Sequence, residues 1–160
     1  MNLAPSVHDI FAGIEQWPLS VWAREDYYAY FVALIFHAWG MALLVGGGIV
    51  IALRGLGVGS AVPLLKFRGF IPLMWLGALL AIPSGLVLLV AYPAKAFTNP
   101  LFVIKFACLI GAALLVRRLM RSDIPPRNVR LLAVLSLLLW LCGVSAGKLL
   151  LHTYRILTVT

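Results

Sequence analysis

Charged residues are scarce in this chain. Aspartate, glutamate, lysine and arginine together make up 11% of its 160 residues, whereas 63% of the residues are hydrophobic and the mean hydropathy is +1.04. Soluble globular domains are only about 45–50% apolar. The composition therefore argues against a soluble globular domain and favours an integral membrane protein.

The few charges separate four long apolar runs, each near or above the roughly 20 residues that cross a hydrocarbon core as an α-helix. The runs cover residues 27–53, 70–92, 100–119 and 130–152. Helices joined by short connections pack antiparallel. We predict an all-α fold in which residues 26–160 form an integral-membrane, antiparallel four-helix bundle.

Acidic residues are absent from all four runs. Beyond residue 26 the only carboxylate side chain is that of Asp123, in the connection between the third and fourth runs. Di-metal carboxylate sites, carboxylate proton relays and aspartate-lined ion pathways all need acids within the membrane helices. The sequence argues against these three kinds of site.

Basic residues are more frequent than acids, and they give a net charge of +8. In a soluble protein this charge would suggest a nucleic-acid partner, but here it lies mainly in two connections between apolar runs. These connections hold Arg54, Lys66 and Arg68, and Arg117, Arg118, Arg121, Arg127 and Arg130, whereas the opposite side holds Arg24, Lys95 and Arg155. By the positive-inside rule, we expect the lipid bilayer as partner, no nucleic acid, and both termini on the non-cytoplasmic side.

Residues 1–25 lack the basic start and continuous apolar core of a signal peptide. Val7, Ile10, Phe11, Ile14 and Trp17 recur at helical spacing, and Ser6 with Asp9 has the form of a capping box. We predict an amphipathic helix on the outer membrane surface. The alternative is a disordered lead-in.

Proline and glycine mark several features of the expected helices. Pro83 lies mid-span, where it must release a backbone carbonyl and kink the helix, and the small residues Ser84 and Gly85 would let another helix or water satisfy that group. Thr98 or Asn99 would cap the third span, with Pro100 at its first position.

Small residues also indicate close contacts between helices. Gly143 and Gly147 form a G-x-x-x-G pair, and Gly46–Gly48 would admit a neighbouring helix or a flat ligand. The two cysteines, Cys108 and Cys142, both fall within spans as packing residues, with a disulfide left open.

Four basic or imidazole side chains lie within the spans, all toward the outer side: His37, Lys105, Lys148 and His152. Lys148 and His152 are four residues apart and share a helix face. A lysine in hydrocarbon costs on the order of 2.5–3.5 kcal/mol, and the spans contain no acid to balance it. Either the lysines reach the headgroups with their long side chains, or an anionic cofactor or a partner subunit neutralises them.

His37 is too short to reach the membrane surface, and neutral imidazole is a common axial ligand of haem iron. A b-type haem bound by His37 would bring propionates to Lys105 or Lys148, and Gly40, Gly47 and Gly143 would make room for its flat face. His152 is the first choice for a sixth ligand, although it stands at the end of its span. A neutral Lys105 or five-coordinate iron are alternatives, and a hydrogen-bonded packing histidine is the simpler interpretation of His37.

The segments YFVALIFHAWGMALLVGGGIVIALRGLG, FTNPLFVIKFACL and LLLWLCGVSAGKLLLHTY resemble a group of small bacterial four-helix membrane proteins. The group includes the membrane domain of copper-resistance protein D and the HemJ-type protoporphyrinogen oxidases. His37 and Lys105 match the shared histidine and lysine. The ending LWLCGVSAGK is most similar to an uncharacterised family with a W…aGR pattern, where Lys148 takes the arginine position. The resemblance implies haem b and a bacterial inner membrane with periplasmic termini.

Together these features predict a cytochrome b-like membrane protein for electron transfer, or a redox subunit of a larger membrane complex. A cofactor-free structural subunit and a copper-handling protein are the alternatives. Met41, Met74 and Met120 are scattered over the chain, which argues against a copper site. No nucleophile, base and orienting group come together in the sequence, so we expect no enzyme activity from the chain alone.

Overall fold

The computed structural model describes residues 7–121 and 125–157, and within these ranges every regular element is helical. Three elements precede or connect the long helices: α1 (Val7–Ile14), α2 (Pro18–Glu25) and α5 (Pro93–Phe97). The long helices are α3 (Tyr27–Gly55), α4 (Phe70–Ala91), α6 (Pro100–Leu119) and α7 (Pro126–Leu157), and a 3₁₀ helix, η1 (Leu64–Gly69), leads into α4.

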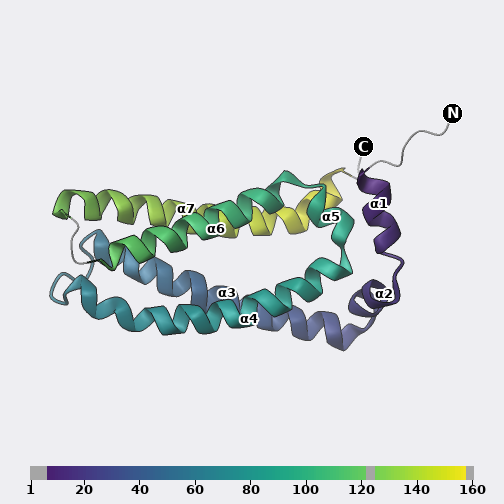
Figure 1. The fold of residues 1–160 in the computed structure, drawn as a ribbon, viewed down its shortest axis with the longest axis horizontal. Coiled ribbons are helices and arrows are strands. Elements are labelled where there is room, and N and C mark those ends of the chain that lie inside the picture. Colours follow the sequence, from purple (N-terminus) through teal and green to yellow (C-terminus); the bar gives the residue numbers. More distant parts are fainter. Residues whose placement is uncertain (1–6, 122–124, 158–160) are drawn as a thin grey trace.

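Four helical stretches are long and apolar enough to cross a bilayer: Tyr27–Gly55, Leu64–Ala91, Pro100–Leu119 and Arg127–Thr153. The predicted all-α, antiparallel four-helix membrane bundle is confirmed. The chain is a multi-pass membrane protein in contact with lipid. Because the number of spans is even, α1 and the last turns of α7 lie at the same end of the bundle, beside α5 (Figure 1).

The bundle consists of two helix pairs. The most extensive contacts join α3 to α4 and α6 to α7, and α3 connects the pairs by packing mainly against α7 (Figure 1). An antiparallel pair with a short connection is the expected product of consecutive spans. Helix α3 therefore contacts its own partner, α4, and also the α6–α7 pair.

Large buried side chains gather in the half of the bundle that contains the two basic connections. The main core cluster comprises Val45, Ile51, Met74, Ala112, Val116, Leu119, Met120, Ala133 and Trp140. In the half toward α5 the buried residues are small, among them Ala33, Gly40, Ala81, Ser84, Ala91, Ala94 and Ala146. One half is thus held by bulky apolar packing and the other by close approach of small residues.

Glycines allow the helices to approach closely. A Cβ added at Gly40 would lie 2.5 Å from the backbone nitrogen of Ala81, and one at Gly48 would collide with the Trp140 ring. At Gly143 an added Cβ would lie 2.9 Å from Leu109. Small residues thus set these helix contacts, as in other membrane bundles.

Several boundaries differ from those expected. The N-terminal segment forms two short helices rather than one, because a turn at Glu15–Trp17 precedes Pro18, which starts α2. Ser6, half of the expected capping box, lies outside the described residues. The five-residue helix α5 was not anticipated, and α7 begins at Pro126, four residues before the expected start. Pro83 lies inside α4, which continues to Ala91, as expected, and the kink at this proline stays a prediction.

The start of α6 agrees with the sequence. Asn99, rather than Thr98, is the N-cap, since its side-chain oxygen accepts a hydrogen bond of 2.9 Å from the Leu101 amide, and Pro100 occupies the first turn. The Asn99 amide also donates to the Thr153 hydroxyl of α7 at 2.9 Å. The cap therefore fixes where α6 begins and ties it to α7.

Candidate functional site

His37 lies at the contact between α3 and α4, in the half of the bundle lined by small residues. Its side chain is half-buried, and its Nδ1 is 3.0 Å from the backbone carbonyl oxygen of Ala81. A carbonyl can only accept a hydrogen bond, so the Nδ1–H donates and Nε2 keeps its lone pair in the neutral ring. The ring therefore has one nitrogen tied to α4 and one with a lone pair that can act as a ligand.

Ser84 and Gly85 complete the surroundings of the His37 ring. The Ser84 hydroxyl donates to the Leu80 carbonyl at 2.5 Å and lies 3.4 Å from Nδ1. A Cβ added at Gly85 would lie 3.1 Å from Cε1 of the ring. The absence of a side chain at Gly85 thus allows the imidazole to lie against α4.

Pro83 lies in the segment of α4 that His37 contacts, but His37 does not bond to the carbonyl that the proline frees. Proline at position 83 lacks the amide that would bond to the Leu79 carbonyl. The carbonyl that His37 engages is instead that of Ala81, one turn before Gly85. How the Leu79 carbonyl is satisfied, by another helix or by water, stays a prediction.

Lys105 projects from α6 toward the same region. It is half-buried, and its charge lies close enough to His37 for the two groups to interact electrostatically. The aliphatic part of its side chain lies against Gly147 of α7, where an added Cβ would be 3.5 Å from Cδ and Cε. The Lys105 ammonium is 5.8 Å from the centre of the Phe106 ring. The structure therefore brings His37 and Lys105 to the same region of the bundle.

Lys148 and His152 point elsewhere. Both side chains are exposed on α7, and Nδ1 of His152 is 3.0 Å from the Lys148 carbonyl, a bond within its own helix. The predicted roles of Lys148 as an anchor for the cofactor and of His152 as the sixth ligand of the iron stay predictions. Their positions at the membrane surface suit contact with water or headgroups.

The three glycines expected to make room for a flat ring are occupied by helix packing. Gly40 contacts α4, Gly47 faces the Met74 side chain, which would lie 2.6 Å from an added Cβ, and Gly143 faces Leu109. Helix contact, the simpler of the two interpretations, accounts for all three. A flat ligand bound at His37 must therefore lie outside the helix contacts at these three glycines.

Three of the methionines in the described part of the chain lie in or against the hydrophobic core cluster. Met74 and Met120 belong to the hydrophobic core cluster, against which Met41 also packs. Cys108 and Cys142 are free thiols that face each other across α6 and α7 with sulfur atoms 3.3 Å apart. In 7–121 and 125–157 no three His, Cys, Asp or Glu side chains are grouped to hold a metal ion.

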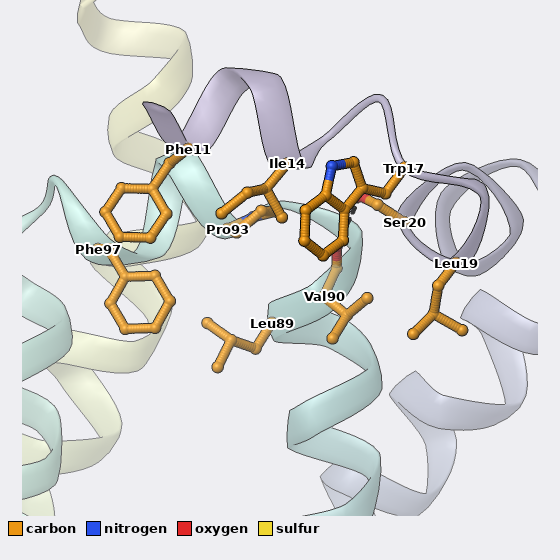
Figure 2. Close-up of a pocket in the computed structure, with 9 residues that line it drawn as sticks. All are labelled: Phe11, Ile14, Trp17, Leu19, Ser20, Leu89, Val90, Pro93 and Phe97. Carbon is orange, nitrogen blue, oxygen red and sulfur yellow. Dashed lines mark hydrogen bonds between the residues drawn. The ribbon is translucent and has the colours of Figure 1, made fainter. Parts of the chain in front are cut away.

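The N-terminal helices cover the α5 end of the bundle. The Ser20 hydroxyl donates to the Val90 carbonyl at 2.7 Å, the Glu15 carboxylate accepts from the Ala94 amide at 3.1 Å, and Phe11 stacks on Phe97 at 4.9 Å. Between these contacts is an apolar cavity of about 250 Å³, whose lining includes Trp17 and Leu89 (Figure 2). The segment is thus docked on α4 and α5, with its Trp17 largely exposed.

Comparison with known proteins adds no assignment: no family model, no curated protein and no solved structure matches the chain.

Proposed function

We propose that the chain is a b-type haem-binding membrane protein that carries electrons, with Nε2 of His37 as an axial ligand to the iron. The observation that carries the proposal is the hydrogen bond from Nδ1 of His37 to the Ala81 carbonyl. Histidines that bind metals usually donate their second ring nitrogen to a carbonyl or carboxylate, which sets the tautomer and the ring direction. His37 already has this arrangement.

Lys105 supports the proposal by its charge. Its side chain is half-buried near His37, and none of the helices α3, α4, α6 and α7 contains a carboxylate. A cation in hydrocarbon is stabilised by a negative group at hydrogen-bonding distance. A haem propionate is such a group, and Lys105 would hold it and so orient the macrocycle relative to His37.

Among the residues that the structure describes, no large side chain of the main core cluster lies against His37, but the small residues there bring α3 and α4 into close contact, so a haem would lie outside that contact. The bulky core cluster lies toward the basic connections, and the residues buried around His37 are small. Bound haem iron exchanges one electron at a time, with a potential set by its axial ligands and its surroundings. The protein's own contribution would be His37 as ligand, Lys105 as anchor, and apolar helices that exclude water.

The test is the visible spectrum of the full chain purified in detergent and titrated with haem b. We expect a Soret band in the unsubstituted chain and none in His37→Ala. The matched control, His152→Ala, should keep the band, either at the same wavelength or shifted because the sixth ligand has changed. Lys105→Met should weaken haem binding by roughly 10- to 150-fold, the equivalent of one charge-assisted hydrogen bond of about 1.5–3 kcal/mol. A Soret band that His37→Ala leaves unchanged would exclude this site.

The finer assignments belong to the same proposal. The resemblance to small bacterial four-helix proteins and the basic connections support a bacterial inner membrane, with both termini in the periplasm. Other membrane subunits would serve as electron donor and acceptor.

A cofactor-free subunit is the second candidate. Only 11% of the most apolar stretch of α6 is buried within the chain, so most of this helix faces lipid or another protein. In that case Lys105 would pair with an acid of a neighbouring chain. Co-purification with a fixed partner, in a complex with no visible absorbance, would favour this function over the first.

A further inference from the structure

Three exposed arginines line an open hollow at the surface where α6 ends. Arg117, Arg118 and Arg121, together with Leu114, line a hollow of about 450 Å³. Leu114, Arg117 and Arg118 are spaced i, i+3 and i+4, which places them on one face of α6, and Arg121 follows two residues after the helix ends. The end of this helix face and the residue just beyond it therefore place three cations next to an apolar residue.

The same face continues into the membrane as an apolar strip. Leu114 is 58% exposed and Ile110, one turn earlier, is 59% exposed. Val103, two further turns away, is 69% exposed. Exposed side chains of this kind on a spanning helix face lipid tails, so the three arginines stand at the level where the tails give way to headgroups.

The surroundings of the cavity carry an excess of positive charge. The two connections at this end of the bundle and the helix turns beside them hold eight lysines and arginines and one acid, Asp123, so positive charge is in excess there. Arg68 also reaches the end of α6, where its Nε and Nη2 donate to the Met120 carbonyl at 3.2 and 2.6 Å. This carbonyl therefore does not depend on the arginines of the cavity for a cap.

We propose that this face of α6 binds one anionic phospholipid, with its headgroup phosphate held by Arg117, Arg118 and Arg121 and an acyl chain along Leu114 and Ile110. Guanidinium groups bind phosphate oxygens in a bidentate manner, and basic pockets between headgroups and helices are known lipid sites. A lipid fits better than free phosphate, because the apolar strip and the cations are continuous. The site is independent of the haem proposal.

The test measures lipid binding to the purified full chain by native mass spectrometry. Phosphatidylglycerol is compared with phosphatidylcholine of the same acyl chains, since both carry a phosphate but only the first has a net charge. The variant R117Q/R118Q/R121Q is compared with K66Q/R127Q/R130Q, which removes equal charge from exposed positions outside the cavity at the same membrane face.

We expect phosphatidylglycerol to bind in preference to phosphatidylcholine, and the cavity variant to weaken it by at least about tenfold while the control variant changes it little. R117K/R118K/R121K, which keeps the charge but loses bidentate bonding, should bind with intermediate affinity. The proposal would be overturned if both lipids bound equally, or if R117Q/R118Q/R121Q and K66Q/R127Q/R130Q lost the same affinity for phosphatidylglycerol. It would also be overturned if inorganic phosphate alone displaced phosphatidylglycerol as well as the lipid itself does.

Discussion

At the scale of single residues, glycine contacts decide how closely α3 and α4 approach. Gly40→Ala would place a Cβ 2.5 Å from the Ala81 backbone nitrogen and 2.7 Å from the Gly77 oxygen, and backbone atoms cannot move aside as a side-chain tip can. We expect a loss of about 1–3 kcal/mol in the free energy of unfolding, as in other overpacked contacts. The measurement is detergent-induced unfolding followed by circular dichroism.

Gly46→Ala is the matched control for that prediction. Gly46 lies in the same helix, and an added Cβ there would have no neighbour within 4 Å. The free energy of unfolding should therefore change little or rise slightly, because alanine favours the helix. Equal destabilisation by both substitutions would contradict the close contact at Gly40.

The residues of the candidate site were predictable only in part. An imidazole and a lysine in spans without acids stand out in the sequence, and Lys105 lies near enough to His37 for the two groups to interact electrostatically. The partner of His37 was not predictable, because the Ala81 carbonyl belongs to the backbone, which every residue has, and its choice depends on how α3 is rotated against α4. The same rotation directs Gly40 and Gly47 into helix contacts rather than toward open space.

At the scale of elements, hydropathy predicted the four spans well because each must be about as long as the bilayer is thick. It could not predict α5 or the division of the N-terminal segment into α1 and α2. These elements are short, and their positions depend on hydrogen bonds to distant parts of the chain, such as those of Ser20 with Val90 and Glu15 with Ala94. The spacing of apolar residues along the sequence does not indicate which distant residues will form these hydrogen bonds.

The docking of α1 and α2 can be tested through those two hydrogen bonds. Ser20→Ala and Glu15→Ala should each cost about 0.5–1.5 kcal/mol of docking free energy, so backbone amides in residues 11–25 should exchange hydrogen faster. Amides in the middle of α3 should be unaffected. Hydrogen–deuterium exchange with mass spectrometry measures both regions in one experiment.

Glu15→Gln separates the hydrogen bond from the charge in this docking. A glutamine side-chain oxygen still accepts a bond from the Ala94 amide, so exchange in residues 11–25 should remain close to that of the unsubstituted chain. Fast exchange in Glu15→Gln would show that the carboxylate acts by its charge.

At the scale of the whole molecule, packing and charge are distributed unequally between the two ends. The bulky core cluster and the two basic connections share one end, and His37, Lys105 and the docked N-terminal helices share the other. The basic end is therefore anchored by its core and its charges together. The opposite end is held by small buried residues, by the hydrogen bonds of Ser20 and Glu15, and by aromatic contacts such as that of Phe11 with Phe97.

This asymmetry leads to a prediction of orientation. The two connections at the core end contain eight lysines and arginines, Arg54, Lys66, Arg68, Arg117, Arg118, Arg121, Arg127 and Arg130, whereas the connection between α4 and α6 contains Lys95 alone. Basic residues near short connections are retained in the cytoplasm. Alkaline phosphatase, which is active only outside the cytoplasm, should be active when fused after Thr160 or inserted beside Lys95, and inactive when inserted at Gly59. A green fluorescent protein fused at the same positions should show the reverse pattern, and phosphatase activity at Gly59 with none after Thr160 would invert the orientation.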